Sequence, residues 1–393
     1  GAASDKTWTR CGRRIPYLVV GSLVAVLVMC LLPNAGSFGM AVSTAMIFGL
    51  VSLMFLDTSI NMAMQPFKMM VGDMVIEKQK GLAYSIQSFL CNAGSLVGFL
   101  FPFIFTWIGI SNIAPQGVVP DSVIYSFYIG AAILILCVIY TTVKVKEMPP
   151  AEYAEYHGIT EEEKKEKINM VKLLVKAPKA FWTVGLVQFF CWFAFMFMWT
   201  YTNGSVAANV FDAPTVETVV NGANKVVLDT KSIQYQNAAD WVGVLFAVHA
   251  IGSVLWAVCI PMFKNRKLIY SLSLVLGGIG FISTYFVHNQ YVLFISFLLI
   301  GCAWAAMLAL PFTILTNALS GGHMGTYLGL FNGTICIPQI VAATLGGSIL
   351  ALFTPKGMLP PEINMLVMAG VMLIIGAVCV YLIKETKGEQ AKA

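Results

Sequence analysis

The sequence predicts an all-α protein that crosses the membrane many times, and two observations lead to this prediction. Of its 393 residues, 58% are hydrophobic and only 11% are charged, and the mean hydropathy is +0.79. Soluble domains carry about 25% charged residues. The apolar residues also gather in runs long enough to span a bilayer as helices, which satisfy their backbone hydrogen bonds internally.

Ten such runs follow one another along the chain. They fall near 15–33, 39–66, 81–109, 122–143, 179–203, 239–263, 268–287, 290–315, 325–353 and 362–383. The charged stretch 144–178 separates four runs from six and is predicted to be a cytoplasmic linker. This gives an N-terminal bundle over 1–143 and a C-terminal six-helix bundle over 179–393. The second bundle carries a polar external insert at 204–238 and ends in a cytoplasmic tail.

Lysine and arginine predict the orientation. If both ends of the chain are cytoplasmic, only Lys225, Lys231 and Lys356 of the 24 basic residues fall on the outer side. Cytoplasmic loops of membrane proteins carry an excess of basic residues. We therefore expect a multi-pass protein of the cell membrane, surrounded by the lipid bilayer. The pI near 8.6 reflects this topology, and we expect no nucleic-acid partner.

Metal or cofactor chemistry is not expected. The nine cysteines are scattered, mostly inside apolar runs, with no CxxC pair, and no histidine cluster accompanies them. They are interpreted as small buried hydrophobic residues.

The two halves of the chain match if the first half lacks two helices. Pro66 is followed by Gly81, which opens a helix rich in small residues, and Pro311 is followed in the same way by Gly325. Transporters are commonly built from such internal repeats. We expect an intact design of six plus six helices, with two helices preceding Gly1. A true ten-helix protein is the alternative.

The segment LDTSINMAMQPFKMMVGD at 56–73 places an acidic residue inside an apolar run. Asp57 precedes Pro66 by about 13 Å at a rise of 1.5 Å per residue, which puts it near the middle of the membrane. A carboxylate there costs roughly 2.5–3.5 kcal/mol and is a candidate functional group. Asn61 and Lys68 follow on the same helical face. Asp57 is either a functional group that lines a central cavity, or a permanent partner of Lys68 or of a neighbouring helix.

Other polar side chains in the runs allow two interpretations, sugar binding or adhesion between helices. Sugar recognition requires hydrogen-bonding groups beside flat aromatic surfaces. Gln188 and Trp192 share one helical stripe, and a glutamine within a membrane span requires a polar partner. The further candidates of this kind are Asn92, Asn332 and Gln339.

Three stretches resemble a known family. SDKTWTRCGRRIPY, at 4–17, resembles the loop between the second and third helices of the major facilitator superfamily. The segment 56–73 resembles the fourth-helix motif of the sucrose–proton symporters, within the glycoside–pentoside–hexuronide symporter group, although Lys68 stands where those proteins usually have arginine. VQFFCWFAFMFMWTYTNG, at 187–204, resembles their seventh helix. The resemblance implies the two-bundle major facilitator fold and proton coupling at Asp57.

The resemblance of the opening loop also implies a cytoplasmic gate. Its charged residues would form ion pairs and helix-end contacts that hold the inner side closed. The residues assigned to this gate are Asp5, Arg10, Arg13, Arg14 and Asp73. Plain anchoring by basic residues on the cytoplasmic side is the alternative.

These inferences predict a monomeric secondary transporter that carries a glycoside, such as the disaccharides sucrose or maltose, with a proton. The two bundles would rock to expose the site to each side in turn. The predicted substrate-binding residues are Asn61, Lys68, Asn92, Gln188, Trp192, Asn332 and Gln339. A sodium-coupled transporter and a transport-inactive sensor are the alternatives. An enzyme is disfavoured because the chain has no HExxH, GxSxG or Walker A motif.

Overall fold

A computed structural model describes most of the chain. The described residues are 9, 12–40, 42–74, 77–111, 119–147, 149, 152, 174–175, 177–220, 223–263, 265–318, 324–355 and 357–383. The chain divides into two compact units, Gly1–Glu166 and Lys167–Ala393, each with its own hydrophobic core. The predicted linker 144–178 lies mostly outside the described residues.

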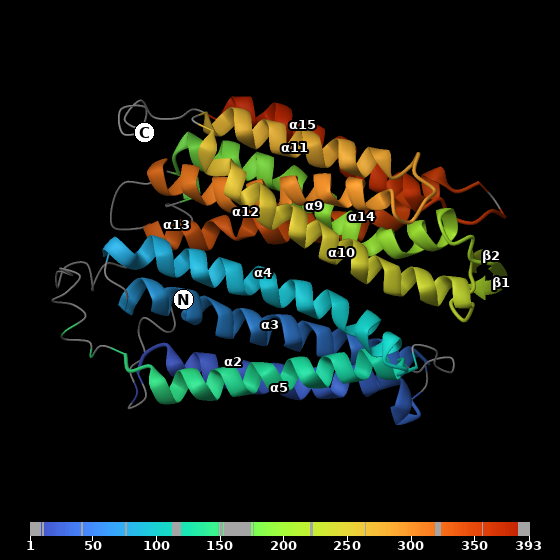
Figure 1. Cartoon of the computed structure of the whole chain (residues 1–393), viewed down its shortest axis with the longest axis horizontal. Helices are drawn as coiled ribbons and strands as arrows, with labels where there is room; N and C mark the ends of the chain where they lie inside the picture. Colours follow the sequence, from blue (N-terminus) through green and yellow to red (C-terminus); the bar gives the residue numbers. More distant parts are fainter. Residues whose placement is uncertain are drawn as a thin grey trace. The chain divides into compact units, whose positions relative to one another are not determined.

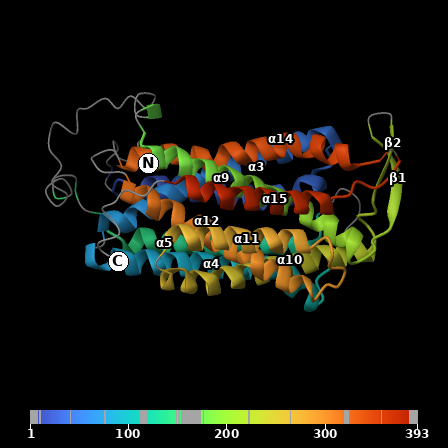
Figure 2. The same cartoon turned by 90° about the horizontal axis from the view of Figure 1, so that it is seen from above.

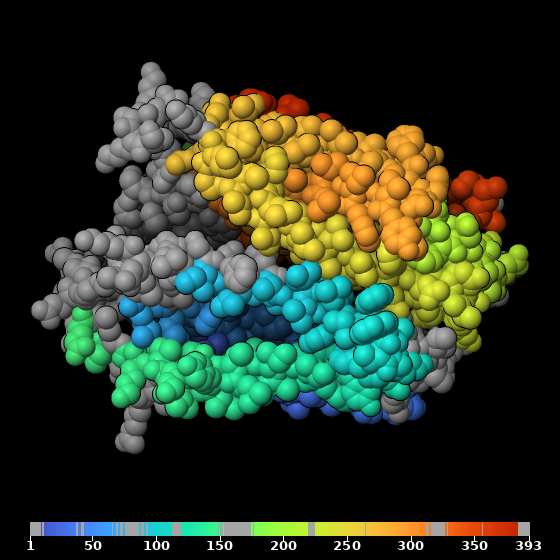
Figure 3. Space-filling view, viewed as in Figure 1, coloured from blue at the N-terminus to red at the C-terminus, as the bar shows by residue number. Residues whose placement is uncertain are grey.

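Unit 1 contains four long helices. These are α2 (Ile15–Leu31), α3 (Val42–Met74), α4 (Glu77–Trp107) and α5 (Asp121–Lys144), with the 3-10 turn η1 (Leu32–Phe38) after α2 (Figure 1). Helix α2 packs against both α3 and α5, and α4 and α5 lie on one face of the unit and meet where α4 ends and α5 begins (Figure 3). Gly21 of α2 allows the closest approach, because a Cβ there would lie 2.7 Å from the carbonyl oxygen of Ser59 in α3.

Unit 2 is built around one buried helix. Its helices are α9 (Lys179–Asn209), α10 (Ile233–Cys259), α11 (Arg266–Ser283), α12 (Leu293–Ala318), α13 (Met324–Phe331), α14 (Gly333–Phe353) and α15 (Ile363–Cys379), with 3-10 turns η2 (Ile260–Met262) and η3 (Val380–Leu382). Helix α9 contacts α10, α12, α14 and α15. It is apolar on nearly all sides, as expected of a helix enclosed by others. Phe195 and Phe197 of α9 are fully buried with Tyr270 and Phe281 of α11.

A β-hairpin interrupts the helical architecture of unit 2. Strand β1 (Thr215–Val220) pairs antiparallel with β2 (Ala223–Leu228), and Thr215 lies opposite Leu228. The hairpin lies at the end of the unit where α9 stops and α10 begins (Figures 1 and 2). Ser232 caps α10, because its hydroxyl accepts a hydrogen bond of 3.2 Å from the amide of Tyr235.

The prediction of a polytopic helical membrane protein is confirmed. Within the described ranges, nine helices are long and apolar enough to cross a membrane, and α4 adds a shorter apolar segment, Ala93–Trp107. The insert expected at 204–238 is shorter than predicted, because α9 continues to Asn209 and α10 already begins at Ile233. Ser205 and Ala207 are small enough to pack inside the bundle, so the helix stays favourable beyond the apolar run.

The single helix expected over 325–353 is instead two helices that meet at Asn332. The local hydrogen bonds there tighten to three-residue spacing: the amide of Asn332 donates to the carbonyl of Gly329 over 3.3 Å, and that of Ile335 donates to the carbonyl of Asn332 over 3.0 Å. Glycines at 329 and 333 lower the cost of leaving α-helical geometry. The break therefore follows from the two glycines that flank Asn332 closely.

Candidate functional site

Gln188 and Trp192 lie one turn apart on α9 and are both buried inside unit 2, with 1% and 8% of their surfaces exposed. The side-chain amide of Gln188 donates a hydrogen bond of 2.8 Å to the carbonyl oxygen of Met307 in α12. Its Oε1 atom accepts no hydrogen bond from the described residues, and the Nε1–H of Trp192 finds no acceptor among them. Two predicted substrate-binding residues thus present an unused acceptor and an unused donor.

Trp304 of α12 lies at the centre of the surrounding aromatic residues. Its ring centroid is 5.7 Å from that of Trp192, 5.8 Å from that of Trp199 and 4.9 Å from that of Phe195. His249 of α10 lies 5.9 Å from Trp304 between ring centroids, and its Nε2 is buried with no partner among the described residues. We call Trp192, Phe195, Trp199, His249 and Trp304 the tryptophan cluster.

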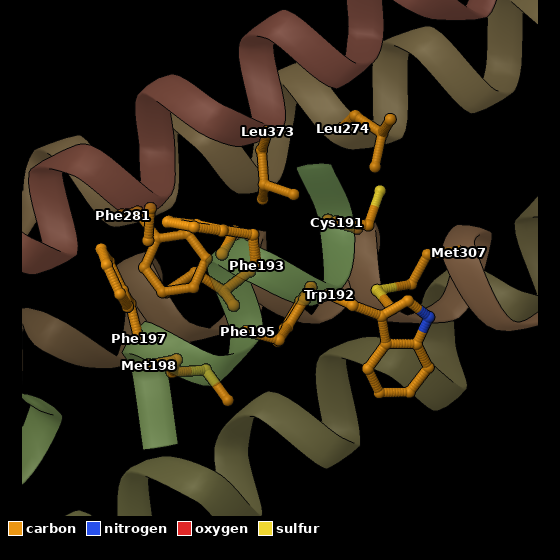
Figure 4. Close-up of a cluster of buried hydrophobic side chains, with 14 of the residues drawn as sticks. Cys191, Trp192, Phe193, Phe195, Phe197, Met198, Leu274, Phe281, Met307 and Leu373 are labelled. Atoms are coloured by element: carbon orange, nitrogen blue, oxygen red, sulfur yellow. The ribbon is translucent and has the colours of Figure 1, made fainter. Parts of the chain in front are cut away.

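Consecutive residues of α9 point to different neighbours in this region. Figure 4 shows Cys191 pointing toward Leu274, whereas Trp192 extends in the direction of Met307. The thiol side of α9 therefore belongs to the apolar core. The side that carries Gln188 and Trp192 faces α12 and holds the unpartnered polar atoms.

Chemically, the tryptophan cluster and Gln188 together suit a hydroxylated ligand or ordered water. A buried polar group without a hydrogen bond costs about 1–3 kcal/mol. Three such groups (Gln188 Oε1, Trp192 Nε1 and His249 Nε2) occur beside flat aromatic rings. Ligand hydroxyls can both donate and accept, and could satisfy groups of both kinds.

Unit 1 holds the predicted coupling residue. Asp57 is exposed on α3, and the amide Nδ2 of Asn61 donates to its Oδ1 over 3.1 Å and to its backbone carbonyl over 2.9 Å. Ser59 and Ala63 form the face of α3 that packs on Gly21 of α2. Asp57 lies about 200° around the helix from Ser59 at 3.6 residues per turn, and so on the side turned away from α2.

The structure places the other predicted residues of unit 1 only in part. Lys68 and Asp73 belong to α3 and Asn92 belongs to α4, but their side chains lie outside what the structure describes. Asp5 and Arg10 of the predicted gate also lie outside the described residues. The permanent pair of Asp57 with Lys68 therefore stays an open interpretation.

A carboxylate that the sequence did not single out contacts the predicted gate segment. Glu147 accepts hydrogen bonds from the backbone amides of Arg13, Arg14 and Ile15, with N–O distances between 2.7 and 2.9 Å. These amides begin α2, where a negative charge is favoured by the helix dipole. No sequence signal indicated this contact, because the two partners are more than 130 positions apart.

The two candidates on the last helices of unit 2 lie in different settings. Asn332 is exposed at the break between α13 and α14, where its amide nitrogen lies 4.0 Å from the sulfur of Cys336. Gln339 is half-buried in α14, next to Pro338. Helix α14 packs along α9, where Thr334 approaches Gly185.

Sequence reasoning did not identify Trp304 or His249 as members of this site. A tryptophan within a run of apolar residues carries no distinguishing pattern, and only the packing of α12 against α9 and α10 brings it to Trp192. A pocket formed by described residues lies elsewhere in unit 2. It is lined by Ser205, Val206, Asn209, Val210, Thr284, Leu293, Phe297, Ile363 and Leu366.

Comparisons with known proteins agree with this architecture. A family model described as the Major Facilitator Superfamily matches residues 1–223. The structure is similar to a crystal structure of a D-xylose–proton symporter, with 15% identity, a TM-score of 0.68, and 99% of this chain and 85% of that chain covered. It is also similar to the xylose transporter of E. coli in an inward-open conformation, with 14% identity, a TM-score of 0.64, and 99% and 83% covered.

A nucleoside transporter is a third similar structure, with 12% identity, a TM-score of 0.63, and 98% of this chain and 85% of that chain covered. At these identities the likeness concerns the fold alone. The family match extends over more than half of the chain. This chain therefore belongs to the major facilitator superfamily of membrane transporters.

Proposed function

We propose that this chain is a secondary active transporter that carries a glycoside together with a proton, a disaccharide such as sucrose or maltose being the favoured substrate. Asp57 is the proton-coupling residue. The substrate contacts come from Asn61, Lys68, Asn92, Gln188, Trp192, Asn332 and Gln339. Protonation of Asp57 and binding of the sugar together permit the two bundles to change the side to which the site opens.

The unpartnered polar atoms beside the tryptophan cluster carry this proposal. Burying an amide oxygen and an indole N–H without hydrogen-bond partners is costly in free energy. A bound ligand that completes their hydrogen bonds would remove this cost. A sugar offers hydroxyl groups for Gln188 and Trp192 and C–H faces for the indole rings. Two of the similar solved structures are transporters of xylose, which favours a sugar over other solutes.

The coupling role of Asp57 rests on its position and surroundings. It is an exposed carboxylate on the α3 face turned away from α2, with an asparagine amide on one oxygen. One of the similar solved structures is a proton symporter, which favours a proton over sodium.

The gate, the domain arrangement and the orientation complete the proposal. Asp5, Arg10, Arg13, Arg14 and Asp73 close the cytoplasmic side, and the cap of Glu147 on the first amides of α2 holds that segment in place. The linker 144–178 joins the bundles 1–143 and 179–393 in the cytoplasm. Both ends of the chain are cytoplasmic, the protein works as a monomer in the cell membrane, and it belongs to the sucrose symporter group.

The test is uptake into liposomes that contain the purified protein, with an imposed proton gradient. Labelled sucrose, maltose, xylose and a nucleoside are offered in turn. We expect accumulation of a disaccharide that collapses with a protonophore and continues without sodium. Accumulation that requires sodium would replace the proton by sodium, and accumulation of the nucleoside alone would overturn the sugar assignment. No uptake of any solute by a protein that still binds a sugar would favour the sensor.

A further inference from the structure

The hairpin end of unit 2 contains a carboxylate that the transport proposal does not use. Glu362 directly precedes α15 and the membrane span that begins at Ile363. Its carboxyl group lies against the backbone of Gly204 in α9, so closely that a Cβ at position 204 would overlap Oε2. Only glycine leaves room for the carboxyl group there, so this contact joins the start of α15 to α9.

In the part of unit 2 that the structure describes, no positively charged group interacts with Glu362. Among the described residues, no hydrogen bond or ion pair reaches its carboxylate. The titratable groups that interact with it are the hydroxyls of Tyr201 from α9 and Tyr235 from α10. Helix α14 approaches the same place through Gly346, where a Cβ would lie 2.6 Å from the Tyr201 hydroxyl, and brings no charged side chain to it.

Asn203 offers an acceptor at the same end of α9. Its Nδ2 donates a hydrogen bond of 2.9 Å to the hydroxyl of Tyr235. Its Oδ1 is buried and accepts nothing from the described residues. A buried position where no described residue donates a hydrogen bond to the carboxyl group disfavours a carboxylate anion and tolerates a neutral carboxylic acid. Consistent with this, burial raises the pKa of the Glu362 carboxyl from 4.5 to about 7.

We propose that Glu362 is a second proton-binding site, separate from Asp57, and that its charge controls the contact between α9 and α15. The neutral acid rests on Gly204 and keeps the hairpin end of unit 2 closed. When it ionises, its O–H bond breaks and the proton passes to water at that end. The carboxylate then has no partner at its contact with Gly204. The first turn of α15 therefore moves away from Gly204, and water reaches the carboxylate.

This proposal concerns unit 2 alone and does not depend on which solute is carried. Its test is hydrogen–deuterium exchange of the full chain in detergent at about pH 6 and about pH 8, corrected for the intrinsic effect of pH. In the wild type we expect exchange in peptides covering 201–206 and 359–366 to rise at the higher pH. Glu362→Gln, which stays neutral, should show low exchange at both.

Two further variants sharpen the result. Gly204→Ala inserts a Cβ into the carboxyl seat, and we expect high exchange at both pH values. Glu217→Gln removes an exposed carboxylate from β1 at the same end of unit 2 and should behave as the wild type. The proposal is overturned if exchange in the wild type does not rise with pH, or if Glu362→Gln keeps the wild-type rise.

Thermal unfolding gives an independent readout. Because the pKa of Glu362 in the folded protein lies above its ordinary value, the stabilisation is complete below pH 4.5 and is lost as the pH rises through about 7. The wild type and Glu217→Gln should therefore lose Tm between about pH 5 and about pH 8, and Glu362→Gln should lose less. An equal loss in all three proteins would place the titrating group elsewhere.

Discussion

The candidate polar residues of the two units differ in burial and in their hydrogen-bond partners. In unit 1, Asp57 is exposed and receives the amide of Asn61, and Glu147 receives three backbone amides. In unit 2, Gln188 is buried with its Oε1 unpartnered, and the indole N–H of Trp192 is in the same situation. The difference indicates where a ligand gains most. A polar group that already has partners gains little from a new one, whereas an unpartnered buried group gains a whole hydrogen bond.

The largest expected effect comes from unit 1. Asp57→Asn keeps the size of the side chain and an oxygen for the amide of Asn61, but it cannot take up a proton. We expect sugar accumulation against a gradient to be abolished while expression and folding persist. Uptake driven by a proton gradient in liposomes measures this.

The matched control for that variant is Asp121→Asn. Asp121 is also exposed, in the first turn of α5, where its charge favours the helix by about 0.3–1 kcal/mol. Its replacement should leave accumulation in place. If Asp57→Asn accumulates sugar as well as the control does, Asp57 is not the coupling residue.

A smaller effect is expected from the acceptor in unit 2. Gln188→Leu removes the unpartnered Oε1 together with the hydrogen bond to the Met307 carbonyl. We expect sugar affinity to fall about tenfold, which corresponds to about 1.4 kcal/mol. Isothermal titration with the sugar identified by uptake gives the Kd directly.

Gln236→Leu serves as the control for this substitution. Gln236 lies near the start of α10, is only partly buried and donates to the carbonyl of Thr230 over 2.6 Å. The Gln236→Leu variant should lose a comparable hydrogen bond and keep the wild-type Kd for the sugar. Equal sugar affinities in the two variants would mean that Gln188 does not contact the sugar.

Trp192→Phe tests the donor and should have a weaker effect still. The ring that packs on Trp304 is largely kept, but the unpartnered N–H is lost. We expect affinity to fall about threefold and stability to stay nearly unchanged, because no existing hydrogen bond is broken. Calorimetric Kd values and thermal unfolding together measure both quantities.

Trp241→Phe is the control for Trp192→Phe, because it removes an indole N–H that already has an acceptor. The N–H of Trp241 donates to the carbonyl of Gln290 over 3.2 Å, so its removal should cost about 1 kcal/mol of stability and leave the Kd unchanged. A loss of stability in Trp192→Phe equal to that in Trp241→Phe would mean that the Trp192 N–H is already satisfied.

The last prediction concerns stability alone, at a carboxylate of unit 1 that has partners. Glu147→Gln keeps an oxygen for the amides of Arg13, Arg14 and Ile15 but removes the negative charge at the start of α2. We expect about 1 kcal/mol lower stability, seen as a lower Tm. The exposed Glu217→Gln is the control and should shift the Tm less. No difference between them would leave Glu147 without a capping role.

The helices were predictable because each one spans a bilayer on its own composition. All ten apolar runs are helical. Most differ from the prediction only at their ends, as at Asn209 and Ile233, and the run 325–353 is divided into α13 and α14. The contacts of the polar residues were harder to predict from the sequence. The spacing of Asp57 and Asn61 within one helix predicted a shared face, and the structure adds their hydrogen bond. The break at Asn332 was not predicted, because the run 325–353 is apolar throughout and long enough for a single span.

By itself, the sequence determined that this protein is a bundle of membrane helices, which helices carry polar groups, and which residues share a helical stripe. These properties follow from hydropathy and from the 3.6-residue period of the helix, and both are local. Only the tertiary structure decided that Gln188 and Trp192 meet α12 and Trp304, that Glu147 caps α2, and that Glu362 rests on Gly204. Those contacts join residues far apart in the chain, and no local pattern encodes which helices pack together.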